Sequence, residues 1–156
     1  LLFPNARFIT SRVAYERALQ PHPRDRASFI PELMQLLQEN SDRLHLITDA
    51  TCNLLGPAYR FFYSDGHTPG LLMTMIDNSG RRLLYVSDLI PGAPWVHLPV
   101  TMGYDRAPEL LIDEKRQLLD YCVSHNVELF FTHDPNMDVA NVKCSEGRYS
   151  ALASAI

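Results

Sequence analysis

Three side chains, two histidines and an aspartate, carry the chemistry that this sequence suggests. His67 lies in the turn Asp-Gly-His-Thr-Pro-Gly, where Gly and Pro serve the backbone but an imidazole has no structural use. Asp88 and His133 follow two other apolar runs. Imidazole and carboxylate are ligands of zinc and other divalent metals, and a His-Asp-His set leaves positions open for water. The plainer alternative is that the histidines are surface residues and the aspartate forms a turn.

The elements that must position these side chains are three strand-like runs, each with His or Asp just past its end. They span residues 59–63, 82–86 and 127–131. Neighbouring strands lie roughly 5 Å apart, so the three ends converge on one rim if the strands point the same way. The two oxygens of Asp88 could then bridge two metals. Asp65 and Asp134, beside the histidines, are predicted to accept hydrogen bonds from the imidazole N–H groups.

The remaining pattern indicates an α/β fold, a mixed sheet covered by helices. Further strands are expected at residues 7–10, 44–48, 71–76 and after 139, and helices at 11–19, 28–39 and 111–126, with another helix beginning after Ser150. The inner face of the third helix is predicted to consist of Leu111, Lys115, Leu118, Leu119, Cys122 and Val123. Asn126 is expected to end that helix.

Composition narrows the function classes. Hydrophobic residues make up 46% of the 156 residues, enough for a core, and the net charge of −4 is mixed along the chain. Basic pairs are separated by acids, which argues against nucleic acid, and no apolar run could cross a membrane. Cys52, Cys122 and Cys144 lack the spacing of a zinc knuckle or disulfide frame, so we expect reduced thiols in a cytoplasmic protein.

Three motifs resemble the C-terminal metal motifs of the metallo-β-lactamase-fold hydrolases. They are Gly-His-Thr-Pro-Gly (66–70), Leu-Leu-Tyr-Val-Ser-Asp-Leu-Ile-Pro (83–91) and Phe-Phe-Thr-His-Asp-Pro (130–135). Residues 3–7 and the helix after them resemble the segment that follows the family's first metal motif, and residues 88–99 resemble the bacterial lactonase-like and phosphotriesterase-like branch. The resemblance implies that residues 1–156 form a single partial domain, the C-terminal part of a four-layer αββα sandwich.

The resemblance also implies roles for the three side chains. His67 would complete a three-histidine metal site, Asp88 would be the catalytic residue that bridges both metals, and His133 would belong to the second site. The metals would be two zinc ions per complete domain, with iron or manganese as alternatives. The reaction would be hydrolysis of a lactone, ester or phosphotriester by a metal-bridging hydroxide.

The sequence departs from the family pattern at two places. Leu71 stands where the family often has a second histidine, which is not a metal ligand there. The first motif, His-x-His-x-Asp-His, is absent, because no two of the six histidines are separated by one residue. We therefore expect a C-terminal portion whose partner is the N-terminal half of the same domain, and which alone neither binds two metals tightly nor hydrolyses a substrate. A second copy of the chain is a further candidate partner.

Two other functions remain open at this point. One is a non-catalytic binding or scaffold protein of the same fold, in which the absent half has lost its ligands. The other is a diiron redox protein of the same superfamily. Trp95, His97 and Tyr104, in the long loop after Asp88, are the predicted contacts of a small-molecule substrate. For Trp95, packing over the sheet edge is an equal alternative.

Overall fold

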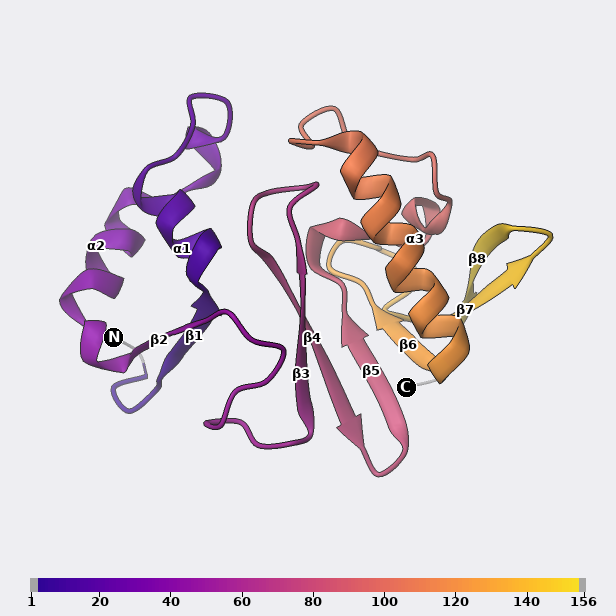
Figure 1. Cartoon of the computed structure of the whole chain (residues 1–156), viewed down its shortest axis with the longest axis horizontal. Coiled ribbons are helices and arrows are strands. Elements are labelled where there is room, and N and C mark those ends of the chain that lie inside the picture. Colours follow the sequence, from indigo (N-terminus) through magenta and orange to yellow (C-terminus); the bar gives the residue numbers. More distant parts are fainter. Residues whose placement is uncertain (1–2, 155–156) are drawn as a thin grey trace. The chain divides into compact units, whose positions relative to one another are not determined.

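A computed structural model describes residues 3–154 of the chain. They form two compact units, one ending at Asp49 and the other beginning at Ala50. Figure 1 shows both units, which are described separately below. The sequence analysis expected one partial domain, and this division neither supports nor excludes it.

The first unit is a short parallel strand pair with two helices. Strand β1 (Phe8–Ser11) pairs in parallel with β2 (Leu44–Ile47), and helices α1 (Arg12–Leu19) and α2 (Pro31–Glu39) lie between them in the chain (Figure 1). Two short 3₁₀ turns, Arg26–Ser28 and Ser41–Arg43, flank α2. The Ser11 hydroxyl accepts the Ala14 N–H and so caps α1, while Pro31 occupies the first turn of α2, where no helical donor is lost.

The second unit is a mixed sheet of six strands with one long helix. The strands are β3 (Tyr59–Ser64), β4 (Leu71–Asn78), β5 (Arg81–Tyr85), β6 (Val127–Phe130), β7 (Val139–Ser145) and β8 (Arg148–Ala153), in that order across the sheet. Among the described strands of this sheet, only β5 and β6 pair in parallel, and helix α3 (Pro108–His125) makes the crossover between them. Figure 1 shows α3 running over the sheet. The α/β class expected from the sequence is confirmed.

Helix α3 buries the face that its spacing predicts, with one exception. Leu111, Lys115, Leu118, Leu119 and Cys122 are buried, whereas Val123 is 43% exposed. Asn126 adopts the left-handed conformation and donates its N–H to the Cys122 carbonyl, which ends the helix as predicted.

The prediction of a helix after Ser150 is wrong, because residues 148–153 form strand β8. Ala151 and Leu152 are good helix formers, but both pair with β7 in an antiparallel ladder, opposite Val142 and Asn141. Pairing with a neighbouring strand outweighs a propensity difference of a few tenths of a kcal/mol per residue.

The strand directions place three strand ends at one rim. β3 is antiparallel to β4, β4 is antiparallel to β5, and β5 is parallel to β6. β3, β5 and β6 therefore all point the same way. The segments that carry His67, Asp88 and His133 leave the sheet at the same edge, which is the arrangement that the sequence analysis required.

The three cysteines are free thiols with different exposure: Cys52 and Cys122 are buried, and Cys144 is exposed. Burial raises the pKa of the Cys122 thiol to about 12. We expect a thiol reagent at pH 8 to modify Cys144 at least about tenfold faster than Cys122, because Cys122 is buried and its raised pKa keeps it protonated, whereas Cys144 is exposed to the reagent. Mass spectrometry of the labelled peptides checks this order, and equal rates would contradict the burial of Cys122.

Among residues 3–154, no helix combines the length and hydrophobicity that crossing a bilayer requires.

Candidate metal centre

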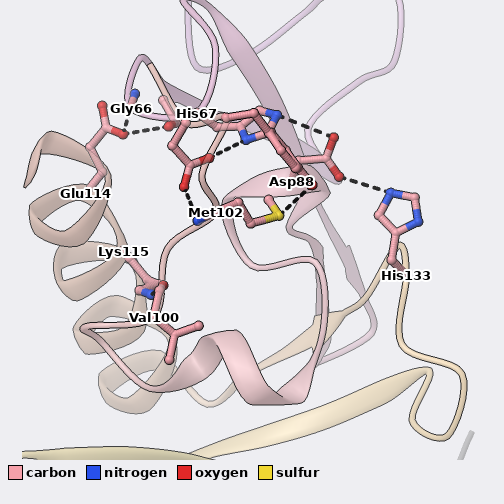
Figure 2. Close-up of polar contacts among 11 residues, drawn as sticks. Gly66, His67, Asp88, Val100, Met102, Glu114, Lys115 and His133 are labelled. Carbon is pink, nitrogen blue, oxygen red and sulfur yellow. Dashed lines mark hydrogen bonds and ion pairs between the residues drawn. The ribbon is translucent and has the colours of Figure 1, made fainter. Parts of the chain in front are cut away.

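The carboxylate of Asp88 lies between the imidazoles of His67 and His133. Its Oδ2 is 3.7 Å from His67 Nε2, and its Oδ1 is 3.2 Å from His133 Nε2. Figure 2 shows both imidazoles directed at this carboxylate. The His67 side chain is mostly buried, while that of His133 is 65% exposed. Each oxygen of Asp88 therefore has one imidazole nitrogen beside it.

The 3.7 Å separation at His67 is longer than a hydrogen bond, and both separations are compatible with two ligands of one metal ion. Zinc bonds of about 2.0–2.2 Å at a tetrahedral angle place two ligand atoms about 3.4 Å apart. The two observed distances, 3.7 and 3.2 Å, lie on either side of this value. Within residues 3–154, however, no group of three or more His, Cys, Asp and Glu side chains is arranged to hold a metal ion by itself. Two metal positions sharing Asp88 would each need further ligands.

The turn that carries His67 is closed by Asp65. The Asp65 carboxylate accepts the Gly70 N–H at 2.7 Å, and Gly70 takes a positive φ of 77°, which a glycine adopts without strain. Asp65 was expected to accept from an imidazole N–H group. The structure instead uses its carboxylate for the backbone of the turn, a routine role for aspartate.

Asp134, like Asp65, accepts hydrogen bonds from backbone N–H groups and not from an imidazole. Its carboxylate accepts the N–H groups of Ala93, Asn136 and Met137, and the bonds from Asn136 and Ala93 lower its pKa below the usual value. The His133 N–H donates to the Pro91 carbonyl at 2.9 Å. The loop after Asp88 and the loop of His133 are thus joined by two hydrogen-bonded contacts.

The carboxylate on the His67 ring is that of Asp105. His67 Nδ1 lies 2.8 Å from Asp105 Oδ1, and the Met102 N–H donates to Asp105 Oδ2 at 2.6 Å (Figure 2). Asp105 is only 2% exposed. Because a carboxylate oxygen accepts hydrogen bonds, this contact assigns the hydrogen of a neutral His67 ring to Nδ1 and leaves the lone pair of Nε2 on the Asp88 side. The sequence analysis missed this residue.

Two consecutive residues of α3 hold the surrounding loops. Glu114 accepts the Ser64 hydroxyl and the N–H groups of Asp65 and Gly66. Lys115, fully buried, donates to the carbonyls of His97 and Val100 at 3.1 and 2.7 Å. Helical spacing placed Lys115 on the buried face, but nothing in the sequence indicated which backbone groups these two side chains would bind.

Burial lowers the pKa of Lys115 to about 8, although the charge of Asp105 opposes the shift. Below pH 8, Lys115 is charged in the folded protein, and the desolvation of this charge destabilises the fold. Between about pH 8 and 10.5, the unfolded chain binds more protons than the folded one, so the free energy of unfolding rises with pH. We expect this rise, on the order of 3 kcal/mol, to be missing in Lys115→Met. Urea unfolding of both proteins at pH 7, 9 and 10.5 measures the difference, and parallel stability curves would contradict the shift.

The three predicted substrate contacts occupy different surroundings. Tyr104 is 59% exposed, and its ring stands edge-on to His67 with 5.9 Å between centroids. Trp95, in the 3₁₀ turn Ala93–Val96, packs against the core, and its buried Nε1 has no hydrogen-bond partner among the described residues. His97 lines a surface hollow with Arg116 and Tyr149. Of the three side chains, that of Tyr104 makes a ring contact with His67.

Solved structures similar to this chain are hydrolases with the same arrangement of elements. AidC, described as a dizinc quorum-quenching lactonase in complex with a product, matches with a TM-score of 0.78 and 22% identity over 100% of this chain and 57% of its own. A probable metal-dependent hydrolase from Staphylococcus aureus matches with a TM-score of 0.80 and 21% identity over 99% of this chain and 55% of its own. AbOPH, described as a hydrolase in the beta lactamase superfamily, matches with a TM-score of 0.76 and 15% identity over 99% and 57%.

The chain has the metallo-β-lactamase fold. It corresponds to the C-terminal part of that fold, as the motifs predicted, and it spans little more than half the length of the matched structures. No family model matches the sequence, and no curated protein does. At 15–22% identity the likeness establishes the metallo-β-lactamase fold and not the activity.

Proposed function

We propose that the whole protein containing this chain is a metal-dependent hydrolase of a lactone, an ester or a phosphotriester, with two zinc ions as its metals. The observation that carries the proposal is the Asp88 carboxylate, with His67 Nε2 beside one oxygen and His133 Nε2 beside the other. One carboxylate that faces two imidazoles suits a pair of metals better than a single ion, because each oxygen can serve a different metal.

The residues of this chain fit their share of such a centre. His67 would hold one metal, His133 the other, and Asp88 both; the remaining ligands would come from the N-terminal half of the same domain. A bound zinc pair supplies Lewis acidity and lowers the pKa of coordinated water. Tyr104 is the proposed substrate contact at the rim, a role supported by its exposure and by its ring contact with His67. The substrate contacts predicted for Trp95 and His97 stay predictions, as does a homodimer.

The matched structures support the hydrolase class. Their descriptions name a dizinc lactonase, a metal-dependent hydrolase and an N-acyl homoserine lactone hydrolase with a product bound at the catalytic metal centre. A lactone is therefore the first substrate to test. Three free cysteines agree with a reducing compartment, and we propose the cytoplasm as the place of action.

The test is metal analysis of the purified whole protein, with a panel of lactone, ester and organophosphate substrates. We expect about two zinc ions per chain and hydrolysis that a chelator abolishes and added zinc restores. A protein that folds but binds no metal and hydrolyses no member of the panel would refute the proposal and favour a binding or scaffold role. Two bound irons with a redox-active absorption spectrum would refute it in favour of the diiron alternative.

A further inference from the structure

Asp105 supplies the buried carboxylate that contacts the His67 ring. Its two oxygens have different partners: Oδ1 faces the His67 ring at 2.8 Å, and Oδ2 accepts the Met102 N–H at 2.6 Å. The carboxylate is buried, so both bonds are shielded from competing water. A buried, doubly bonded carboxylate fixes the plane and the tautomer of the imidazole that it contacts.

Both partners of this hydrogen bond are anchored to the same helix. The His67 turn is held by Glu114, which accepts the Ser64 hydroxyl and the Gly66 N–H. The loop that leads to Asp105 is held by Lys115 through the carbonyls of His97 and Val100. Figure 2 shows Glu114 and Lys115 on successive positions of α3, with Gly66 and His67 on one side and Val100 on the other.

The backbone closes the same connection directly. The Arg106 N–H donates to the His67 carbonyl at 3.2 Å, and the Ala107 N–H donates to the Gly66 carbonyl at 2.9 Å. Residues 106 and 107 lead straight into α3 at Pro108. These two backbone hydrogen bonds therefore fix the His67 turn relative to the Asp105 loop in the metal-free protein.

We propose that Asp105 is the positioning residue of His67: it holds the imidazole in the Nδ1–H tautomer with Nε2 free toward Asp88, and α3 fixes both partners through Glu114 and Lys115. Asp105 acts through His67 and does not itself contact a metal or a substrate. That His67 is a metal ligand rests on the proposed function, whereas its tautomer and orientation are properties of the metal-free protein.

The test uses the whole protein and two substitutions at position 105. Asp105→Ala removes both acceptors. Asp105→Asn keeps one acceptor oxygen but turns an NH₂ group toward one of the two N–H donors, so it preserves the shape and disrupts one bond. In both variants the affinity for zinc is measured by chelator competition. The tautomer of His67 is measured in the metal-free protein by long-range ¹H–¹⁵N correlation.

We expect zinc at the His67 position to bind about 10–100-fold more weakly in Asp105→Ala and by a smaller factor in Asp105→Asn. The Nδ1–H tautomer, dominant in the wild type, should give way to Nε2–H in the alanine variant. Leu119→Ala serves as the control, because it creates a cavity on the same helix and leaves every bond of the network in place. It should lower stability without changing the tautomer or the zinc affinity per folded molecule.

The outcomes separate the two proposals. A wild-type protein that binds no zinc refutes the proposed function, while the tautomer readout still decides the role of Asp105. An unchanged tautomer together with unchanged zinc affinity in Asp105→Ala refutes the positioning role. The same holds if Leu119→Ala shifts the tautomer or the affinity as much as Asp105→Ala, since the effect would then follow from lost stability alone.

Discussion

Replacing Asp88 with asparagine is expected to remove at least one of the two metal ions of the proposed centre and to lower the kcat/KM of the proposed hydrolysis by about 10³-fold or more. The physical reason lies in the two oxygens of this side chain, each of which has an imidazole nitrogen beside it, at 3.7 and 3.2 Å. An asparagine offers one acceptor oxygen and no charge, so it can serve only one metal position. The loss of about 4 kcal/mol of transition-state stabilisation, a usual share for a metal ion, corresponds to that factor.

The comparison that isolates this effect uses the same substitution at another aspartate. Asp120, on α3, accepts the Tyr149 hydroxyl and lies outside the contacts of Asp88, His67 and His133. Asp120→Asn should keep both metals and nearly all of the activity. Metal content by mass spectrometry and initial rates on the best substrate are measured for both variants. Two bound metals and an unchanged rate in Asp88→Asn would contradict the bridging role.

The two histidines refine the same prediction. His67 and His133 face different oxygens of Asp88, so His67→Ala and His133→Ala should each weaken a different metal position. A double substitution should then lose both ions. If either single substitution released both metals to the same extent, the two positions would be coupled more strongly than the geometry indicates.

The part of the site that the sequence could predict is the part governed by local pattern. His67, Asp88 and His133 each follow an apolar run, and the end of a strand is fixed by alternation and by turn residues a few positions away. Their convergence then depends only on strand direction, and β3, β5 and β6 do point the same way. The fold class followed from the same alternation of strands and helices.

The supporting residues could not be predicted, because their partners are far away in the chain. Asp105 is 38 positions from His67, in a loop without periodicity, and Glu114 is 48–50 positions from the groups that it accepts. Asp65 and Asp134 were better candidates by adjacency alone, yet Asp65 accepts the Gly70 N–H, and Asp134 accepts N–H groups two and three positions along the chain as well as that of Ala93. The two neighbouring carboxylates bind backbone N–H groups of their own turns. The carboxylate that contacts the His67 imidazole comes from Asp105, which only the tertiary fold brings close.

Gly66→Ala is expected to destabilise the protein by about 3 kcal/mol and to displace His67 from the proposed metal centre. A Cβ at Gly66 would lie under 3.0 Å from Leu111 Cα, N and Cβ, a separation that real Cβ atoms essentially never show. Two of these three atoms are backbone in the first turn of α3, so no side-chain rotation relieves the overlap. The Ala107 N–H bond to the Gly66 carbonyl and the Gly66 N–H bond to Glu114 would have to lengthen together.

Gly103→Ala provides the matched control, since a Cβ at that position meets no atom within 4 Å and its backbone lies outside the left-handed region. Its free energy of unfolding should stay within about 1 kcal/mol of the wild type. Urea unfolding of the whole protein measures both variants, and zinc affinity measured below the transition reports the position of His67. Because the turn is held to α3 through Gly66 itself, the alanine should weaken zinc binding even in molecules that remain folded. Equal stability and equal zinc affinity for Gly66→Ala and Gly103→Ala would show that the close approach of the turn to α3 does not position the ligand.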